Sequence, residues 1–376
     1  QYMRPRFLTS AVTLLAFGNI GLSPAVAVVR EIALPSPAEG LALSSNEATR
    51  FQAQLRSALQ ADDDGAIIRI TTELLKRRVD QVTAVRLYAF RARAESHQKN
   101  FKLALADAEN AIRLNPSDIS GYYERGGAYN AMGRYQLSLA DAERAVRLKP
   151  NSWAGYWARG VNYDALEQYE RAMEQYNIAV ARGDKNWPVF LARAHLFEQK
   201  RMWREAAQDL DTAVKYCDKR DKGSWWRVTN ADAWLKATCP QDSIRDAASA
   251  VKLAKASCES TDWKSSLSLD TLAAAYAAAS QFDEAVRWQH EALRFEATDR
   301  QIPNDKKTPD LKKYQEHLNS FERHQRVRME SPVATNRDAN NSKRGRFSPI
   351  YHTQQSDVRH PDRRRHRLFG RAVWLG

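Results

Sequence analysis

Cysteine is scarce in this chain. Only three of its 376 residues are cysteines, namely Cys217, Cys239 and Cys258. The pattern around Cys239 and Cys258 predicts opposite ends of one helical hairpin, roughly 15 Å apart at 1.5 Å per residue, which is too far for a disulfide. Three such residues do not make a disulfide framework. We therefore expect all three to be buried as small apolar side chains.

Short catalytic and metal-binding motifs are also missing. The sequence contains no His-Glu-x-x-His pair, no Cys-x-x-Cys, no phosphate-binding loop and no Gly-x-Ser-x-Gly turn. The acidic run Asp62 to Asp64 lacks the alternating ligands and the distant glutamate of an EF-hand loop. Alanine-rich helical hairpins also pack without pockets. The sequence therefore predicts no enzyme activity, no cofactor and no bound metal.

An uninterrupted apolar run long enough for a persistent membrane helix is absent. The mostly apolar stretch from Phe7 to Leu22 contains several polar residues. It follows the basic residues Arg4 and Arg6 and precedes the small-residue sequence Ala25-Val26-Ala27, which together make the three-part pattern of a secretory signal peptide. We predict a cleaved signal over residues 1–27 and export to the periplasm or the cell exterior. An uncleaved membrane anchor and an incidental hydrophobic terminus remain the alternatives.

Positive charge is present but unevenly distributed. The formal net charge is +13, and residues 324–376 alone contribute +8 of it. From residue 331 the chain is polar, basic and poor in periodic apolar residues, which predicts a disordered tail over 331–376. At the other end, residues 28–45 carry two prolines and are interpreted as a linker after the signal.

The most informative feature is an internal repeat over Val85 to Asp218, with a period of about 34 residues. Four contiguous units of equal length start at residues 85, 119, 153 and 187. Aromatic residues fill the fourth position (Tyr88, Tyr122, Tyr156, Phe190) and the seventeenth (Phe101, Tyr135, Tyr169, Trp203), and small residues fill the eighth (Ala92, Gly126, Gly160, Ala194), the twentieth (Ala104, Ser138, Ala172, Ala206) and the twenty-seventh (Ala111, Ala145, Ala179, Ala213). Such columns predict helical hairpins in which small residues allow close approach and aromatics fill the junctions.

These columns resemble the tetratricopeptide repeat (TPR), a helix-turn-helix unit of about 34 residues. Unit boundaries such as Leu114-Asn115-Pro116-Ser117 and Leu148-Lys149-Pro150-Asn151 would end one helix and begin the next. The resemblance implies an all-α fold, a right-handed α-solenoid of TPR hairpins with a capping helix. It also implies a concave groove that takes a peptide or protein partner.

The predicted solenoid covers residues 46–323. Its units are 51–84 (degenerate, acting as a cap), 85–118, 119–152, 153–186, 187–220, 223–260 and 266–299, followed by a capping helix over 311–323. We expect the repeat phase to break after Asp218. The run from Ala233 to Ala277 is also similar to the terminal repeats of a group of bacterial exported TPR proteins, which agrees with the predicted export.

Two charged columns run through the four regular units. The seventh position is always arginine (Arg91, Arg125, Arg159, Arg193), and the twenty-third is Asp107, Asp141, Gln175 and Asp209. We interpret the columns as structural ion pairs across three of the four hairpins. A ligand-binding arginine ladder is the alternative.

Candidate groove residues are the first-helix positions at helical spacing that the frame directs toward the concave face. They are Arg86, Arg93, Tyr123, Asn130, Trp157, Asp164, His195 and Glu198. Tyr123 and Trp157 are predicted as the aromatic contact area, and the two arginines as partners of an acidic group. The Lys/Asn/Asn/Lys/Arg set with which some TPR domains grip chaperone carboxylates is not present.

The sequence thus supports two functional hypotheses. The first is a non-enzymatic scaffold that binds a peptide or protein partner in the groove. The second is an adaptor whose arginine-rich tail binds an acidic envelope polymer or a membrane surface, through residues that include Arg363, Arg364, Arg365 and Arg367. Nucleic acid is not expected as a partner if the protein is exported.

Overall fold

A computed structural model describes residues 45–61, 63–77, 79–183, 185–298 and 304–329 of the chain. These residues belong to one compact unit that ends at Met329. The predicted signal peptide, the predicted linker up to residue 44 and the basic tail over 331–376 lie outside the described residues.

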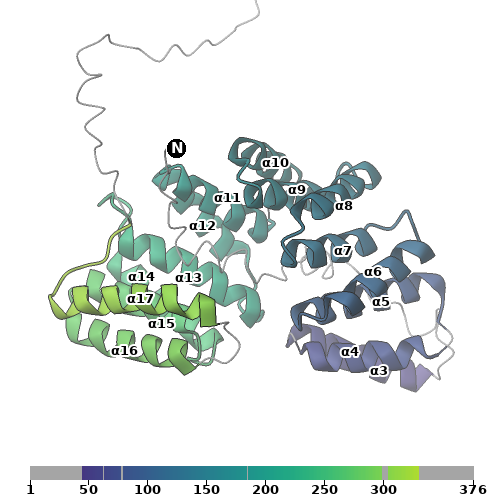
Figure 1. The fold of residues 1–376 in the computed structure, drawn as a ribbon, viewed down its shortest axis with the longest axis horizontal. Coiled ribbons are helices and arrows are strands. Elements are labelled where there is room, and N and C mark those ends of the chain that lie inside the picture. Colours follow the sequence, from purple (N-terminus) through teal and green to yellow (C-terminus); the bar gives the residue numbers. More distant parts are fainter. Residues whose placement is uncertain (1–44, 62, 78, 184, 299–303, 330–376) are drawn as a thin grey trace, which may run out of the picture. The chain divides into compact units, whose positions relative to one another are not determined.

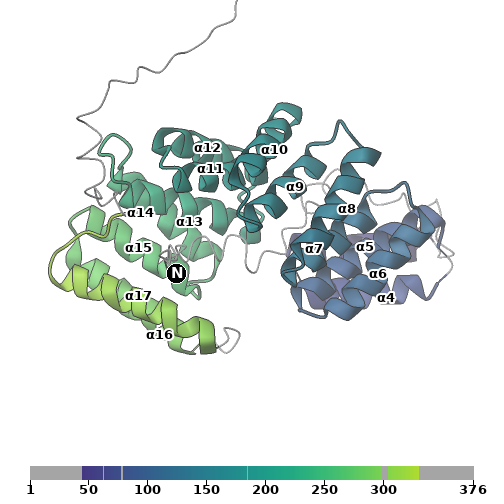
Figure 2. The same cartoon turned by 45° about the horizontal axis from the view of Figure 1, so that its top comes forward.

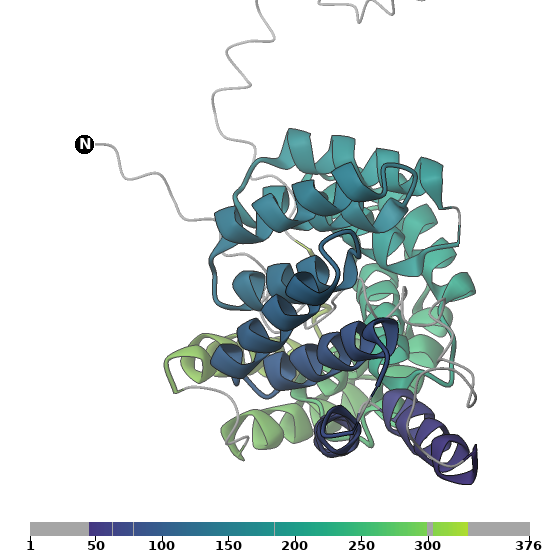
Figure 3. The same cartoon turned by 90° about the vertical axis from the view of Figure 1, so that its right-hand side faces the viewer.

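The described residues form fifteen helices, each of which packs against the next along the chain (Figure 1). Figures 2 and 3 show the same order of neighbours from two other directions. The helices are α3 (Ser45–Gln60), α4 (Asp64–Leu75), α5 (Gln81–His97), α6 (Phe101–Leu114), α7 (Ser120–Ala131), α8 (Tyr135–Leu148), α9 (Trp153–Ala165), α10 (Tyr169–Arg182), α11 (Trp187–Gln199), α12 (Trp203–Tyr216), α13 (Lys222–Thr238), α14 (Ala247–Ser260), α15 (Ser266–Ala278), α16 (Phe282–Thr298) and α17 (Asn304–Glu322). The predicted all-α solenoid of helical hairpins is confirmed.

The small-residue columns explain the close pairing of helices. The alanine at the twenty-seventh position is buried in all four regular units, with at most 1% of its surface exposed. Gly160 on α9 shows how closely the two helices of a hairpin can approach each other. A Cβ atom there would lie 2.4 Å from Cε1 of Tyr176 on α10, so only glycine leaves room for the tyrosine ring.

The turn inside each regular hairpin uses a left-handed residue at the fifteenth position. The φ angles are 62° at Lys99, 72° at Gly133, 58° at Glu167 and 59° at Arg201. Glycine adopts this conformation without a Cβ penalty, whereas the other three residues incur one. The hairpin geometry is therefore the same in all four units, although only one carries the favourable residue.

The repeat phase persists further than the sequence suggests. The helix α13 begins at Lys222, 35 residues after α11 begins at Trp187, so its start keeps the period of about 34 residues to within one residue. The irregularity lies after α13, where residues 239–246 separate it from α14, whereas three residues separate α5 from α6. The expected break at Asp218 is thus corrected to the α13–α14 connection.

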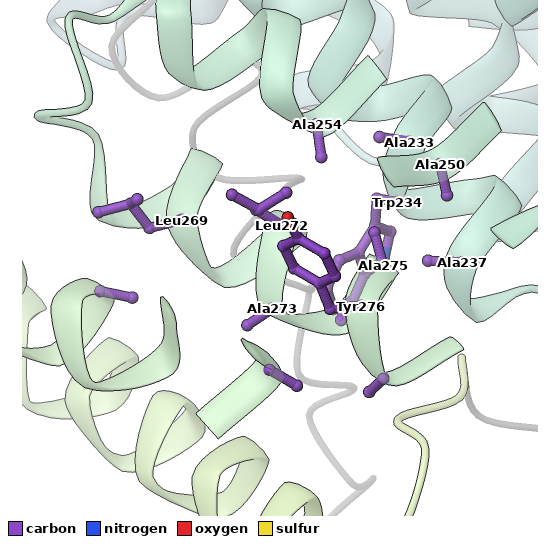
Figure 4. Packing of buried hydrophobic residues seen from close by; sticks show 14 of the residues in the cluster. Ala233, Trp234, Ala237, Ala250, Ala254, Leu269, Leu272, Ala273, Ala275 and Tyr276 are labelled. Carbon is purple, nitrogen blue, oxygen red and sulfur yellow. The ribbon is translucent and has the colours of Figure 1, made fainter. Parts of the chain in front are cut away.

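The largest apolar cluster joins α13, α14, α15, α16 and α17 (Figure 4). It combines alanines with a few large side chains, among them Trp234, Leu272, Tyr276 and Phe321. After α17 the chain runs back to α13, where Met329 N–H donates to the Thr238 carbonyl at 2.9 Å. This return segment, residues 324–329, was not predicted from the sequence.

All three cysteines are free and buried, as expected. Burial raises the pKa of Cys239, and it raises that of Cys258 to about 12, so both thiols stay protonated at neutral pH. Of the helices in the described ranges, none combines the length and the apolar composition that crossing a lipid bilayer requires.

Candidate functional site

The predicted groove residues lie on the first helices of the four regular hairpins. Arg86 and Arg93 are on α5, Tyr123 and Asn130 on α7, Trp157 and Asp164 on α9, and His195 and Glu198 on α11. The structure joins neighbouring first helices through some of them. The Asn130 Nδ2 donates to Oδ1 of Asn162 at 3.1 Å, and the Trp157 Nε1 donates to the Pro188 carbonyl at 3.2 Å.

The two aromatic candidates are packed into the helix junctions. Tyr123 is 3% exposed and Trp157 is 5% exposed, and both belong to the apolar cluster around α9. Trp157 also meets Trp153 edge to face, with ring centroids 6.4 Å apart. They therefore offer a partner little surface, and the prediction that they supply its main contact area gains no support from their position.

The arginine column forms internal ion pairs, as interpreted from the sequence. Arg193 donates from Nε and Nη2 to the two carboxylate oxygens of Asp209, at 2.7 and 2.8 Å. The pairs Arg91–Asp107 and Arg125–Asp141 have the same two-bond geometry. The carboxylate hydrogen bonds raise the pKa of Arg91 and of Arg125.

The third unit lacks this pair. Its position for the aspartate holds Gln175, and neither the Arg159 Nε nor the Gln175 Oε1 has a hydrogen-bond partner among the described residues. The buried side chain at the twenty-third position therefore pairs with the arginine in three units, and its Oε1 lacks a hydrogen-bond partner among the described residues in the fourth case, Gln175.

Arg93 is the most enclosed charged residue of α5. It is 3% exposed, and its guanidinium lies 6.0 Å from the centroid of the Phe90 ring. Its Nε has no hydrogen-bond partner within the described part of the chain. The proposed pairing of Arg93 with an acidic group of a partner stays a prediction, as does that of Arg86, which is half-buried.

A column of acidic residues occupies the twelfth position of three successive units. It consists of Asp164 on α9, Glu198 on α11 and Asp232 on α13, each one repeat period from the next. Burial raises the pKa of Asp164 to about 7. Burial and the nearby Asp232 raise that of Glu198 to about 8. Burial also raises the pKa of Asp232 to about 6, although Lys236 opposes the shift.

The three carboxyl groups differ in how they are compensated. Asp232 forms an ion pair with Lys236, which also binds Asp211 at 2.8 Å. Glu198 lies 4.0 Å from Nδ1 of His195, and burial lowers the pKa of that imidazole to about 4, which leaves the ring neutral at pH 7. The Asp164 carboxyl forms no hydrogen bond or ion pair with any residue that the structure describes. Sequence analysis found Asp164 and Glu198 but missed Asp232, because the phase was thought to end before it.

A second buried polar cluster, also missed from the sequence, holds α17 in place. Asp270 on α15 is fully buried, accepts a hydrogen bond from Gln289 at 2.9 Å and lies 2.6 Å from Nδ1 of His317 on α17. The Lys313 Nζ is 3.9 Å from its other oxygen, and the His317 ring stacks on Trp234 at 5.8 Å. Burial alone would raise the pKa of Asp270, but these neighbours outweigh it and hold that pKa below 3.8. Because Asp270 is enclosed, we interpret the cluster as a structural lock.

No group of three or more His, Cys, Asp or Glu side chains is placed to hold a metal ion within the ranges that the structure covers. The arginines predicted to bind polyanions, Arg363, Arg364, Arg365 and Arg367, lie outside those ranges. Asp164 and Glu198 are the two carboxyl groups among the predicted groove residues, and burial raises the pKa of both.

Comparison with known protein families finds a match to part of the chain. The model described as "Tetratricopeptide repeat" matches residues 119–152, which coincide with the second of the four regular units. A search of curated proteins finds no match.

Solved structures with similar folds have low sequence identity to this chain, and some of them are described as TPR proteins. The crystal structure of the APC/C hetero-tetramer Cut9–Hcn1 matches 80% of this chain with a TM-score of 0.53 at 13% identity, and the match covers 54% of that chain. YrrB, described as a TPR protein with an unusual peptide-binding site, matches 55% of this chain and 97% of its own, at 17% identity and a TM-score of 0.37. TTC0263 from Thermus thermophilus matches 64% of this chain and all of its own, at 17% identity and a TM-score of 0.37. At these identities the likeness concerns the fold alone.

Proposed function

Because the chain is a tetratricopeptide-repeat protein, we propose that it is a non-enzymatic scaffold that binds a peptide or protein partner along the first helices of its hairpins. The observation that carries this proposal is the different use of two charged columns. The arginines of the seventh position are consumed by internal ion pairs in three units. At the twelfth position, Asp164 has no partner among the described residues.

The energetic cost of burying a carboxyl group also supports a binding role for these residues. A buried carboxyl group without a partner destabilises a folded protein. The raised pKa values of Asp164 and Glu198 express that cost. Groups of this kind concentrate at functional sites, because a ligand can supply what the fold does not.

Selection from a random peptide display library tests the proposal. The full chain is immobilised, enriched peptides are synthesised, and their affinity is measured by fluorescence anisotropy. We expect enriched peptides to bind the wild-type chain in a saturable manner. Absence of enrichment over several rounds, at both low and physiological salt, contradicts the proposed function.

A matched pair of bulky substitutions locates the binding face. Asn130→Trp places an indole on the first helix α7, where Asn130 is half-buried. Leu137→Trp places one on the second helix α8, where Leu137 is 47% exposed. Binding along the first helices is expected to be lost in Asn130→Trp and retained in Leu137→Trp, with both variants checked for helical content. The reverse result would place the partner elsewhere.

In the alternative hypothesis, the arginine-rich tail binds the partner. Deleting residues 331–376 removes it and leaves every described residue in place. We expect peptide binding to survive the deletion. Loss of binding would instead favour the adaptor that acts through Arg363, Arg364, Arg365 and Arg367.

The proposed location is outside the cytoplasm, and its support is the signal-like pattern of residues 4–27. Expression of the native gene followed by fractionation and N-terminal mass spectrometry tests this. A mature N-terminus near residue 28 in the exported fraction is expected. Recovery of the uncleaved chain in the cytoplasm contradicts export.

A further inference from the structure

The return segment, residues 324–329, is a non-helical stretch of chain that lies across two hairpins (Figure 1). It first contacts the turn between α15 and α16. The His324 ring stacks on Phe282 with centroids 5.0 Å apart, and the Arg326 Nη2 donates to Oγ of Ser280 at 2.6 Å. From there the segment reaches the end of α13. It therefore connects the turn ends of two successive hairpins.

The end of α13 binds this segment through backbone carbonyls. The Met329 N–H donates to the Thr238 carbonyl, and the Arg328 Nη1 donates to the Ala237 carbonyl at 3.3 Å. Carbonyl groups in the last turn of a helix lack partners within the helix, and they carry its partial negative charge. A backbone N–H and a guanidinium are therefore the groups that this end of α13 binds well.

Two apolar side chains of the segment add a second kind of contact. Val327 and Met329 are both half-buried. Val327 packs against the apolar cluster of α13 to α17, and Met329 packs against that cluster and against a second one that includes Leu235 and Cys239. Residues 327–329 thus present the order apolar–arginine–apolar to the array, in the manner of a short bound peptide.

The attachment of the segment is also easy to release. The segment follows α17, and residues 322–326 are exposed, so its departure breaks no helix. Burial lowers the pKa of Arg328, and the nearby Arg245 and Arg326 lower it further, which shows that like charges crowd this place. A segment with few buried contacts detaches at a lower free energy than the helices of the core unfold.

We propose that the return segment covers a second peptide-binding surface, at the turn ends of the hairpins, and that a partner segment with the order apolar–arginine–apolar displaces it. The surface consists of the end of α13 and the α15–α16 turn. Because the return segment is tethered beside this surface, it competes at a high effective concentration and masks the surface from weak ligands. This inference goes beyond the proposed function, because it does not require binding along the first helices.

The probe is a fluorescently labelled, end-capped peptide with the sequence of residues 324–329, and fluorescence anisotropy measures its binding to the full chain. In the double variant Val327→Ser/Met329→Ser the tethered segment loses both apolar contacts. We expect saturable binding of the peptide to this variant, about tenfold tighter than to the wild type, because the competitor is weakened.

Leu137→Ser/Met202→Ser is the matched control variant, because both residues are exposed and belong to other hairpins. It should bind the peptide as weakly as the wild type does. Circular dichroism checks that both variants keep their helical content. Equal binding by all three proteins overturns the proposal, and so does absence of binding to Val327→Ser/Met329→Ser.

Two alanine-substituted peptides test the chemistry of the surface in the Val327→Ser/Met329→Ser variant. Replacing the arginine that matches Arg328 removes the contact with the Ala237 carbonyl and should weaken binding about tenfold. Replacing the arginine that matches Arg326 changes the charge equally but removes an exposed hydrogen bond, so the loss should be about twofold. Equal losses for the two peptides indicate non-specific attraction and overturn the proposal.

Hydrogen exchange tests the displacement in the wild type, without any substitution. Excess unlabelled peptide should speed the exchange of the Met329 amide, which the Thr238 carbonyl protects in the attached segment, and should leave the amides of α15 unchanged. The peptide is supplied in the millimolar range, which is the effective concentration of a short tether. An unchanged exchange rate at Met329 overturns the displacement.

The first-helix face is tested separately. Asn130→Trp, which is expected to abolish partner binding along the first helices, should leave binding of the 324–329 peptide intact in the Val327→Ser/Met329→Ser background. If library-selected peptides bind but this peptide does not, the second surface is rejected and the scaffold function stands. If only this peptide binds, the second surface stands and the scaffold function is rejected.

Discussion

The four regular hairpins, residues 85–220, and the C-terminal region, residues 222–329, are stabilised in different ways. In the regular hairpins the same arginine–aspartate pair recurs across three units, always 16 residues apart. In the C-terminal region a single cluster around Asp270 connects α15, α16 and α17, and its contact between Asp270 and His317 spans 47 residues. A return segment then connects Met329 to the end of α13.

This difference shows how a repeat protein can end. Inside the array each unit is supported by its two neighbours, so moderate local pairs suffice. The last unit has a neighbour on one side only. A buried polar network and a return segment replace the missing unit there, and loss of either should affect only the nearby helices.

The largest expected effect concerns the Asp270 cluster. Asp270→Ala leaves His317 and Lys313 without their carboxylate, and we expect a loss of about 3–5 kcal/mol in the free energy of unfolding. Urea denaturation measures this loss. Hydrogen exchange should show reduced protection in α15 to α17 and unchanged protection in α7 to α10.

Acid should have the same local effect. The pKa of Asp270 is held below its ordinary value of 3.8, so its contribution is present above about pH 4 and is lost as the pH falls further and the carboxyl is protonated. Glu259→Gln, an exposed change on α14, is the control and should leave the acid profile unchanged. Uniform loss of protection across all helices would contradict a local lock.

The next effect in size concerns one internal ion pair. Asp209→Ala should cost roughly 2 kcal/mol, because the half-buried Arg193 loses two charge-assisted hydrogen bonds. Adding Arg193→Met should recover part of the loss, and a double-mutant cycle by urea denaturation measures the coupling. A coupling energy of zero between Arg193 and Asp209 would show that this ion pair does not stabilise the protein.

A gain of stability is expected in the third unit. Gln175→Asp supplies the carboxylate that the other three units have, opposite Arg159, whose Nε is unsatisfied among the described residues. The free energy of unfolding should rise by about 1 kcal/mol. In an Arg159→Met background the same substitution should destabilise, because the new carboxylate then has no partner. A gain in both backgrounds would contradict the pairing.

The smallest effects concern the left-handed turn residues. Gly133→Ala should cost about 0.5–1 kcal/mol, because alanine is strained at a φ of 72°. Glu167→Gly should gain a few tenths of a kcal/mol at the equivalent position, where φ is 58°. The urea unfolding midpoint should be lower than that of the wild type in Gly133→Ala and higher in Glu167→Gly.

Sequence reasoning located the hairpins and their internal ion pairs well and the candidate site only incompletely. The columns predicted each Arg–Asp pair, including its absence at Gln175. They placed Tyr123 and Trp157 on the right helices but could not show that neighbouring units enclose both rings. Asp232 was missed because the longer connection after α13 hid the phase that the first helix still keeps.

The sequence by itself determined what repeats. Contacts inside a unit and with the next unit recur once in every repeat period, so helix pairing, buried alanines and the arginine struts appear as columns. Only the tertiary structure decided the contacts that occur once: Asp270 with His317, Met329 with Thr238, and the Tyr176 ring against Gly160. A single contact between non-equivalent positions leaves no period in the chain, and its energy depends on the burial that packing alone provides.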